Sequence, residues 1–221
     1  MVKENIQKIR KTILEKFPDF KNKFGEHIVI VAASKNQSVE NLQDLKSLGI
    51  DICGENRVQE FLEKYGKAET KWHFIGNLQT NKVKYIVDKV DLIQSCNSER
   101  LAAQISSQSI KKGIVSNILL EVNVANEESK HGVNLNSFEQ LFEYSKNLKS
   151  LKILGLMAMM PLVKNIEQNT ELYLQMRALY DKIRATYNSF KYLSMGMSND
   201  YMLALKCGAN MIRLGGAIFK N

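Results

Sequence analysis

Residues 27–36, HIVIVAASKN, carry the pattern on which the fold prediction depends. The run 28–33 is apolar, rich in β-branched residues and without polar alternation, which is typical of a strand covered on both faces. Ser34 and Lys35 follow at its carboxyl end, where parallel sheets and barrels bind their ligands. An amine at the mouth of such a strand is partly desolvated, and desolvation lowers its pKa as a Schiff-base lysine requires. The alternative is a lysine whose ammonium simply extends into water.

Seven further short strand patterns follow this run, and each is separated from the next by a helical pattern. Alternation of this kind favours parallel βαβ units, and eight of them close into an α/β fold, the (β/α)8 TIM barrel. An open doubly wound sheet is the competing architecture, but no GxGxxG fingerprint follows the first strand. No linker or low-complexity tract interrupts the chain, so we expect one domain over residues 1–221. The expected strands are 28–33, 50–53, 72–75, 91–95, 117–124, 152–157, 192–195 and 210–214.

The helical patterns between these strands have recognisable starts. Polar residues suited to helix N-caps are Ser38, Ser98, Asn136 or Ser137, and Asn199. Residues 127–132 are expected to form a loop, and a short turn is expected after the last strand. The expected helices are 3–17, 38–48, 56–65, 78–90, 98–112, 136–148, 165–188 and 199–207.

The charge of the chain is basic but dispersed. The formal net charge is +8, and only six of the 31 lysines and arginines are arginine. The lysines are spread along amphipathic segments and are not interleaved with aromatic residues. This pattern favours a solvated, lysine-rich surface over a nucleic-acid interface. A basic nucleic-acid-binding protein is therefore the weaker hypothesis.

The same composition bears on compartment and redox chemistry. No stretch approaches the ~18 apolar residues of a membrane span, and the charged N-terminus has no apolar signal core. We therefore expect a soluble cytoplasmic protein without a membrane partner. Cys53, Cys96 and Cys207 are widely spaced and odd in number, so they indicate small buried thiols and neither a disulfide framework nor a metal site.

The last two strands end in glycine-rich loops. In many barrels a phosphate lies between the loops that follow strands seven and eight. Here those loops contain Gly196, Ser198, Gly215 and Gly216, whose backbone N–H groups and hydroxyl can approach an anion. The alternative is that the glycines serve only tight turns. A phosphate site on the same rim as Lys35 suggests an aldehyde cofactor with a phosphate, such as pyridoxal 5'-phosphate (PLP), or a phosphorylated sugar on a Schiff-base aldolase.

Arg213 lies in the last expected strand, two residues before Gly215. One interpretation is an ion pair that steadies the rim, with Glu55 as an available partner. The other is that it faces a pyridine nitrogen, where an always-charged guanidinium opposes ring protonation. An unprotonated ring is a poor electron sink, so such a site favours holding the cofactor over transamination. His73, at the start of the third strand, is expected to be a hydrogen-bonded structural residue.

Seven stretches in chain order carry a family resemblance. The chain resembles the YggS-like pyridoxal phosphate homeostasis proteins, whose fold is that of the alanine racemase N-terminal barrel. The match covers nearly the whole chain, and together the stretches are highly specific. They are ASK at 33–35, GENRVQE at 54–60, WHFIGNLQTNK at 72–82, EVNVANEESKHG at 121–132, GLMAM at 155–159, LSMGMSND at 193–200 and IRLGGAIF at 212–219.

The resemblance implies a set of cofactor-binding residues and no metal. Lys35 would form a Schiff base with PLP, and Arg213 would lie near the pyridine nitrogen. The phosphate would be bound by Ser198 with the backbone of Gly215 and Gly216. Asn56 and Met157 would lie near the ring. The sequence departs from the family where Cys53 replaces a usual phenylalanine, where Lys-Asn-Gln-Ser at 35–38 replaces a Lys-Thr-Lys-Pro-like run, and where Gly216 replaces a frequent threonine, which removes one phosphate contact.

The resemblance also implies a role in vitamin B6 and amino-acid pools without strong catalysis. Partners would be PLP and PLP-dependent enzymes that lack their cofactor, and the chain is expected to be a monomer. The alternative is a PLP-dependent amino-acid racemase or a related proton-transfer enzyme. The sequence stops shortly after the eighth strand, so the second domain that supplies a catalytic tyrosine in racemases is not expected, which weighs against racemisation.

Overall fold

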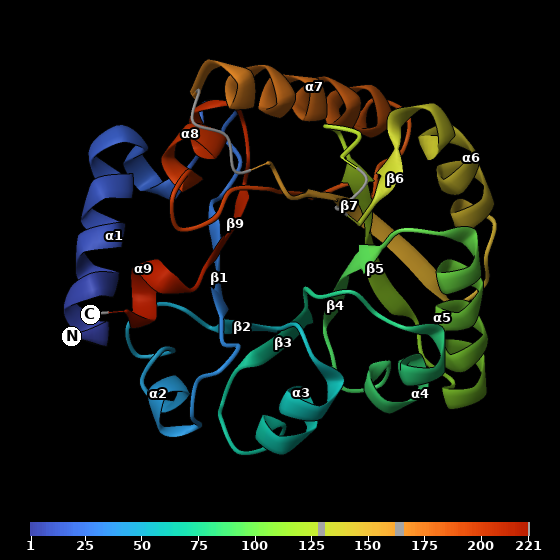
Figure 1. Ribbon diagram of the computed structural model, residues 1–221, viewed down its shortest axis with the longest axis horizontal. Helices are drawn as coiled ribbons and strands as arrows, with labels where there is room; N and C mark the ends of the chain where they lie inside the picture. The colour runs from blue at the N-terminus through green and yellow to red at the C-terminus, as the bar shows by residue number, and fades with distance from the viewer. Residues whose placement is uncertain (128–130, 162–165, 221) are drawn as a thin grey trace.

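The strands form one parallel sheet that closes on itself inside a ring of helices (Figure 1). The computed structural model describes residues 1–127, 131–161 and 166–220. Within this part of the chain, the strand order is β4-β3-β2-β1-β9-β8-β7-β5, and pairing of β4 with β5 closes the barrel. The (β/α)8 prediction is therefore confirmed. The barrel strands are β1 (Val29–Ala33), β2 (Ile52–Glu55), β3 (Lys71–Phe74), β4 (Leu92–Cys96), β5 (Ser116–Asn123), β7 (Leu151–Ala158), β8 (Tyr192–Ser194) and β9 (Met211–Leu214).

The helices cover the outside of the barrel, and the two chain ends lie close together beside α1 and α9 (Figure 1). Asn5 of α1 joins α1 to α9, because its side-chain amide donates to the carbonyl of Ile218 at 3.0 Å. None of the described helices is both long and apolar enough to cross a membrane. The helices are α1 (Val2–Lys16), α2 (Glu40–Gln43), α3 (Val58–Lys64), α4 (Val83–Ile86), α5 (Glu99–Lys112), α6 (Leu135–Lys146), α7 (Ile166–Arg184), α8 (Tyr201–Lys206) and α9 (Gly216–Phe219), with 3-10 turns at Pro18–Phe20 and Thr80–Lys82.

Of the four predicted helix N-caps, that of α5 is right, and those of α2, α6 and α8 are wrong. Ser98 caps α5, since its hydroxyl accepts the amide of Leu101. The cap of α6 is Asn134, whose side chain accepts the amide of Ser137 at 2.9 Å, and not Asn136 or Ser137. The cap position of α8 is held by Asp200 and not Asn199.

The other local differences involve short segments. The helix expected over 38–48 contains only the four residues of α2, with Val39 and not Ser38 at its cap position. Strand β6 (Val133–Asn134) pairs with β5 and was not predicted, because two residues are too few to form a pattern. Residues 128–130 of the expected loop and Asn165, the expected start of the long helix, lie outside the described residues.

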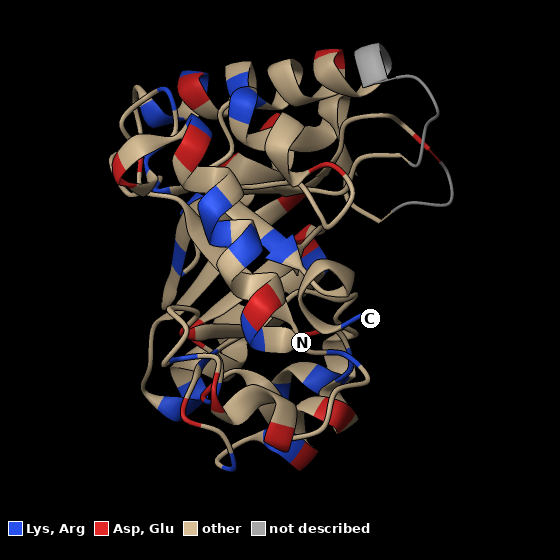
Figure 2. Cartoon of the chain, turned by 90° about the vertical axis from the view of Figure 1, so that its left-hand side faces the viewer, with Lys and Arg blue, Asp and Glu red and all other residues tan. Residues whose placement is uncertain are grey.

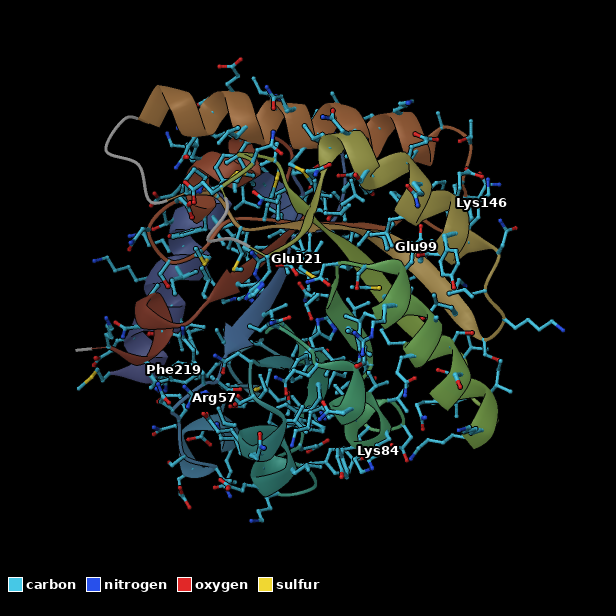
Figure 3. All side chains as sticks on the ribbon, turned by 45° about the vertical axis from the view of Figure 1, so that its right-hand side comes forward. Arg57, Lys84, Glu99, Glu121, Lys146 and Phe219 are labelled. Carbon is cyan, nitrogen blue, oxygen red and sulfur yellow. The ribbon has the colours of Figure 1, made fainter. Side chains whose placement is uncertain are left out.

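Side chains alternate between the inside and the outside of the barrel. A small apolar cluster fills the inside, while the larger core lies between the strands and the helices. Glu121 of β5 lies among the strands, whereas Lys84, Glu99 and Lys146 lie on the surrounding helices (Figure 3). The inner apolar cluster comprises Val31, Ile52, Leu92, Leu119, Leu154, Met157 and Met211.

The outer surface carries both signs of charge. Figure 2 shows Lys and Arg side by side with Asp and Glu over the helices on the face toward the viewer. The three cysteines, Cys53, Cys96 and Cys207, are free and buried, as predicted.

Candidate functional site

A cavity of about 700 Å³ opens at the carboxyl ends of the strands. It forms there because β1 and β9 are neighbours in parallel register, with Val31 opposite Arg213. The loops that follow both strands therefore leave the barrel at the same edge. Six of the seven residues predicted for the site line this cavity: Lys35, Asn56, Ser198, Arg213, Gly215 and Gly216.

Met157, the seventh predicted residue, lies elsewhere. It is fully buried in the inner apolar cluster of the barrel and does not line the cavity. Met159, two residues later, does line it. The two side chains differ because Met157 belongs to strand β7, which ends at Ala158, and Met159 to the loop beyond it.

Lys35 stands at the edge of the cavity, and its side chain is exposed. The prediction of a partly desolvated amine is therefore wrong. The physical reason is its position: two residues beyond the end of β1, it has left the apolar interior that buries Val31 and Ala32. Lys35 forms no ion pair with any residue that the structure describes.

The two glycine-rich loops meet at the Ser198 hydroxyl. Its oxygen accepts the backbone amides of Gly215 at 3.3 Å and Ala217 at 3.0 Å. Two N–H groups thus converge on the Ser198 hydroxyl oxygen and hold it at the cavity, and the hydrogen of this hydroxyl is left to donate to an anion. The sequence identified Ser198 and the glycines but not Ala217, because an alanine amide leaves no signal in a sequence.

Gly196 turns the chain into this loop. Its φ is +93°, and a Cβ there would lie 2.5 Å from the Cβ of Ala204. Only glycine combines this conformation with such close packing. The strand-to-loop geometry before Ser198 therefore depends on this position.

Arg213 is buried in the barrel, below the cavity. Its Nη1 donates to the Ser194 carbonyl at 3.0 Å and to the Ser194 hydroxyl at 2.7 Å, and its Nη2 donates to the carbonyl of Ala158 at 2.9 Å. Burial lowers the pKa of Arg213, while the nearby Tyr173, Glu121 and Asp200 raise it. Its position is thus fixed by the ends of β7 and β8.

The alternative pairing of Arg213 with Glu55 is wrong. Arg213 points into the barrel, whereas Glu55 points out toward α3 and contacts Lys64 and Ser34. The two side chains belong to opposite faces of the sheet, which the alternation of strand residues requires.

A chain of hydrogen bonds continues from Arg213 across the barrel. The Ser194 hydroxyl donates to Oε1 of Gln94 at 2.6 Å, and Nε2 of Gln94 lies 2.9 Å from Nδ1 of His73. Burial lowers the pKa of His73 to about 3. The histidine is therefore neutral near pH 7, and its predicted role as a buried, hydrogen-bonded structural residue is confirmed.

Glu121 is a buried carboxyl group that sequence reasoning did not single out. It is 2 % exposed, and its Oε2 has no hydrogen-bond partner among the described residues. Burial raises the pKa of Glu121 to about 7, against the lowering effects of Arg213 and Asn97. An inward position in the run LLEVN was the only available signal.

Asn56 contributes an unsatisfied acceptor. Its Oδ1 is buried without a hydrogen-bond partner among the described residues, yet the residue lines the cavity. The backbone of Asn56 packs against Gly76 so closely that a Cβ on Gly76 would lie 2.2 Å from the Asn56 carbonyl oxygen. The loop after β3 therefore holds Asn56 in place.

The chain is similar in sequence to proteins of known families. The family model for the alanine racemase N-terminal domain matches residues 2–221. The pyridoxal phosphate homeostasis protein of Aquifex aeolicus is 42% identical over 194 residues, which cover 86% of this chain and 85% of that protein. The protein of the same name from Helicobacter pylori is 37% identical, with 88% of each chain covered.

Among solved structures, PipY of Synechococcus elongatus with PLP bound is similar, at a TM-score of 0.84 and 26% identity, covering 99% of this chain and 100% of that chain. An alanine racemase from Clostridium difficile has a TM-score of 0.80 at 13% identity, covering 99% of this chain and 60% of that one, and shares the fold. By the family match and the identity to its relatives, the chain belongs to the pyridoxal phosphate homeostasis proteins, within the alanine racemase N-terminal domain family.

Proposed function

We propose that this chain binds PLP as a Schiff base on Lys35 and serves vitamin B6 and amino-acid homeostasis inside the cell without strong catalysis. The observation that carries the proposal is the shared cavity: an exposed amine and the Ser198 hydroxyl, with the glycine-rich backbone at 215–216, line the same space. The relatives named for pyridoxal phosphate homeostasis and the PLP-bound PipY support this choice of ligand.

The residues of the cavity fit the three chemical parts of PLP. When bound, the cofactor supplies an aldehyde, which condenses with an amine to a C=N bond and releases one water. Lys35 offers that amine, and Ser198, Gly215 and Gly216 offer the hydroxyl and N–H groups that a phosphate needs. Asn56 lines the cavity, and its buried Oδ1 has no hydrogen-bond partner within the described part of the chain. A cavity of about 700 Å³ is of ordinary size for a cofactor.

The chemistry of Arg213 favours binding of PLP over catalytic turnover with it. Its guanidinium can only donate hydrogen bonds and keeps its positive charge. Next to a pyridine nitrogen it would leave the ring unprotonated, and this disfavours carbanion chemistry.

We propose that residues 1–221 act as one domain and as a monomer in the cytoplasm, and that PLP-dependent enzymes lacking cofactor receive PLP from it. The exposed position of Lys35 supports transfer, because a partner or a free amine can reach it without unfolding the rim.

The test is the absorbance spectrum of the purified chain after incubation with PLP and removal of unbound PLP, which is itself yellow. We expect a yellow band that the Lys35→Ala variant loses and the Lys220→Ala variant keeps, since Lys220 is a second amine at the same cavity. A wild-type chain that is colourless after unbound PLP has been removed would overturn the proposal. Rapid racemisation of any amino acid in a panel, lost in Lys35→Ala, would replace it with the racemase alternative.

A further inference from the structure

A second lysine lies buried beneath the rim, close to Lys35 in space. Lys64, at the end of α3, is 6 % exposed. Its Nζ donates to the backbone carbonyl of Ser34 at 2.8 Å and to Oε1 of Glu55 at 2.6 Å. It also lies 3.9 Å from Oε2 of Glu60. One ammonium therefore connects the residue before Lys35 with two carboxylates.

Both carboxylates in turn bind the neighbours of Lys35. Oε1 of Glu55 accepts the hydroxyl of Ser34 at 2.8 Å, and Oε2 of Glu60 accepts the backbone amide of Asn36 at 3.1 Å. The residues on each side of Lys35 are thus attached to the same charged cluster. Lys35 itself is left out of it and remains exposed at the cavity.

The backbone at this point needs such support. Asn36 has a φ of +59°, a left-handed conformation that an L-residue adopts at a cost. The turn from Ser34 to Gln37 is closed by one backbone bond, from the Gln37 amide to the Ser34 carbonyl at 3.0 Å. That carbonyl is the one that Lys64 also binds.

Stability alone does not account for the cluster. Replacing a buried ion pair with apolar side chains of similar volume is often neutral or stabilising. The ion pair between Lys64 and Glu55 is therefore explained by the turn that it holds in place, which is the turn that carries Lys35. A hydrogen bond from a charged donor is directional, so it fixes the orientation of the Ser34 carbonyl as apolar packing could not.

We propose that Lys64 is a positioning residue for Lys35: through the Ser34 carbonyl, and through Glu55 and Glu60, it holds the turn at 34–37 so that the Lys35 side chain extends into the cavity. The proposal rests on the proposed function, since it concerns the amine that receives PLP. It adds a residue that no motif in the sequence marked.

The test compares Lys64→Met with Arg177→Met. Arg177 forms a comparable buried pair with Glu26 at 2.8 Å, each side chain 8 % exposed, before the amino end of β1 and away from the cavity. Arg177 also pairs with Asp181, and Glu26 also pairs with Arg184. Four quantities are measured: the unfolding free energy, the dissociation constant for PLP from the absorbance titration, amide hydrogen exchange at 34–37, and the pH at which the PLP absorbance band changes. Both variants are expected to lose stability, because each removes a buried cation from a buried carboxylate.

Only Lys64→Met is expected to weaken PLP binding, by about tenfold, as the loss of one charge-assisted hydrogen bond predicts. It is also expected to increase exchange at 34–37 and to move the pH at which the PLP absorbance band changes. Arg177→Met should leave all three of these readouts at the wild-type values.

A double variant separates positioning from stability. Lys64→Met with Glu55→Gln removes both charges, and the new amide still has an oxygen for the Ser34 hydroxyl. We expect it to recover stability but not PLP affinity, because the Ser34 carbonyl still lacks its charged donor. If Lys64→Met does not fold, this variant carries the comparison.

Equal PLP affinity and equal exchange at 34–37 in the wild type and the double variant would overturn the proposal. If the wild type binds no PLP, the proposed function fails instead. Hydrogen exchange at 34–37, measured without PLP, then still decides whether Lys64 holds the turn.

Discussion

Ala32 of β1 and Leu214 of β9 are register partners in adjacent parallel strands. Lys35 follows three residues after the first, and Gly215 immediately follows the second. Because parallel strands end at the same edge of a barrel, this single pairing brings the amine and the glycine-rich loop to one cavity. The predicted meeting of Lys35 with the paired glycines on one rim is confirmed.

The Ser198 hydroxyl is expected to contribute to phosphate binding. Ser198→Ala removes the hydroxyl that would donate to the phosphate and that the amides of Gly215 and Ala217 hold in place. We expect the dissociation constant for PLP to rise by about tenfold, the effect of one hydrogen bond to a charged group. An absorbance titration with PLP measures it.

Pyridoxal, which lacks the phosphate, is the control ligand for this variant. Its affinity should be the same in Ser198→Ala and in the wild type, because the lost contact involves only the phosphate. An equal loss for both ligands would show that Ser198 supports the cavity as a whole and would contradict its assignment to the phosphate.

The stability of the chain is expected to depend on pH through Glu121. The pKa of Glu121 is raised from 4.5 to about 7 by burial, so the folded chain binds this proton more tightly than the unfolded chain. The resulting stabilisation is fully present below pH 4.5 and is lost as the pH rises through 7. Between pH 5 and 8 the loss is on the order of 2 kcal/mol.

Glu121→Gln isolates this contribution. Urea unfolding of both proteins at several pH values gives the difference in their unfolding free energies. The lowered pKa of His73 makes stability rise with pH, but this effect is the same in both proteins and cancels from the difference. We expect the wild type to lose stability relative to the variant as the pH rises. A difference that stays constant from pH 5 to 8 would show that Glu121 does not titrate in this range.

Gly76→Ala is expected to damage the cavity from behind. The added Cβ would lie 2.2 Å from the carbonyl oxygen and 2.5 Å from the Cα of Asn56, so the backbone that carries Asn56 must move. Overpacking of this kind costs about 1–3 kcal/mol, and PLP affinity should fall with it. Thermal unfolding and the PLP titration measure the two effects.

Gly113→Ala provides the matched control. Gly113 has a φ of +65° at the end of α5, and a Cβ there would meet nothing within 4 Å. Its substitution costs backbone strain of about 1 kcal/mol and should leave PLP affinity unchanged. Retention of full affinity in Gly76→Ala would mean that the position of Asn56 is not important for binding.

The fold could be predicted because its signals are local and repeated. Each barrel strand is a short apolar run between helical patterns, and parallel closure follows from their number. What could not be predicted lies where a few atoms decide the outcome. Asn134 rather than Asn136 caps α6, and β6 spans two residues.

Six of the seven residues predicted for the site line one cavity, whereas their side-chain contacts could not be predicted. Lys35, Ser198 and the glycines are found in strand-end motifs, which the sequence displays directly. The partner of Glu55 depends on which face of β2 its side chain occupies. Because Glu55 lies on the outer face, it pairs with Lys64 and not with Arg213. Lys64 itself lies one helix away from the rim in sequence, so only the three-dimensional structure reveals its contact with Ser34.

The central claim is that Lys35 is the residue that binds PLP covalently. The most direct measurement is reduction of the PLP-loaded chain with borohydride, followed by digestion and mass spectrometry of the peptides. We expect one reduced adduct, on Lys35, while Lys220 at the same cavity stays unmodified. An adduct on Lys220 in place of Lys35, or no adduct on either, would contradict it.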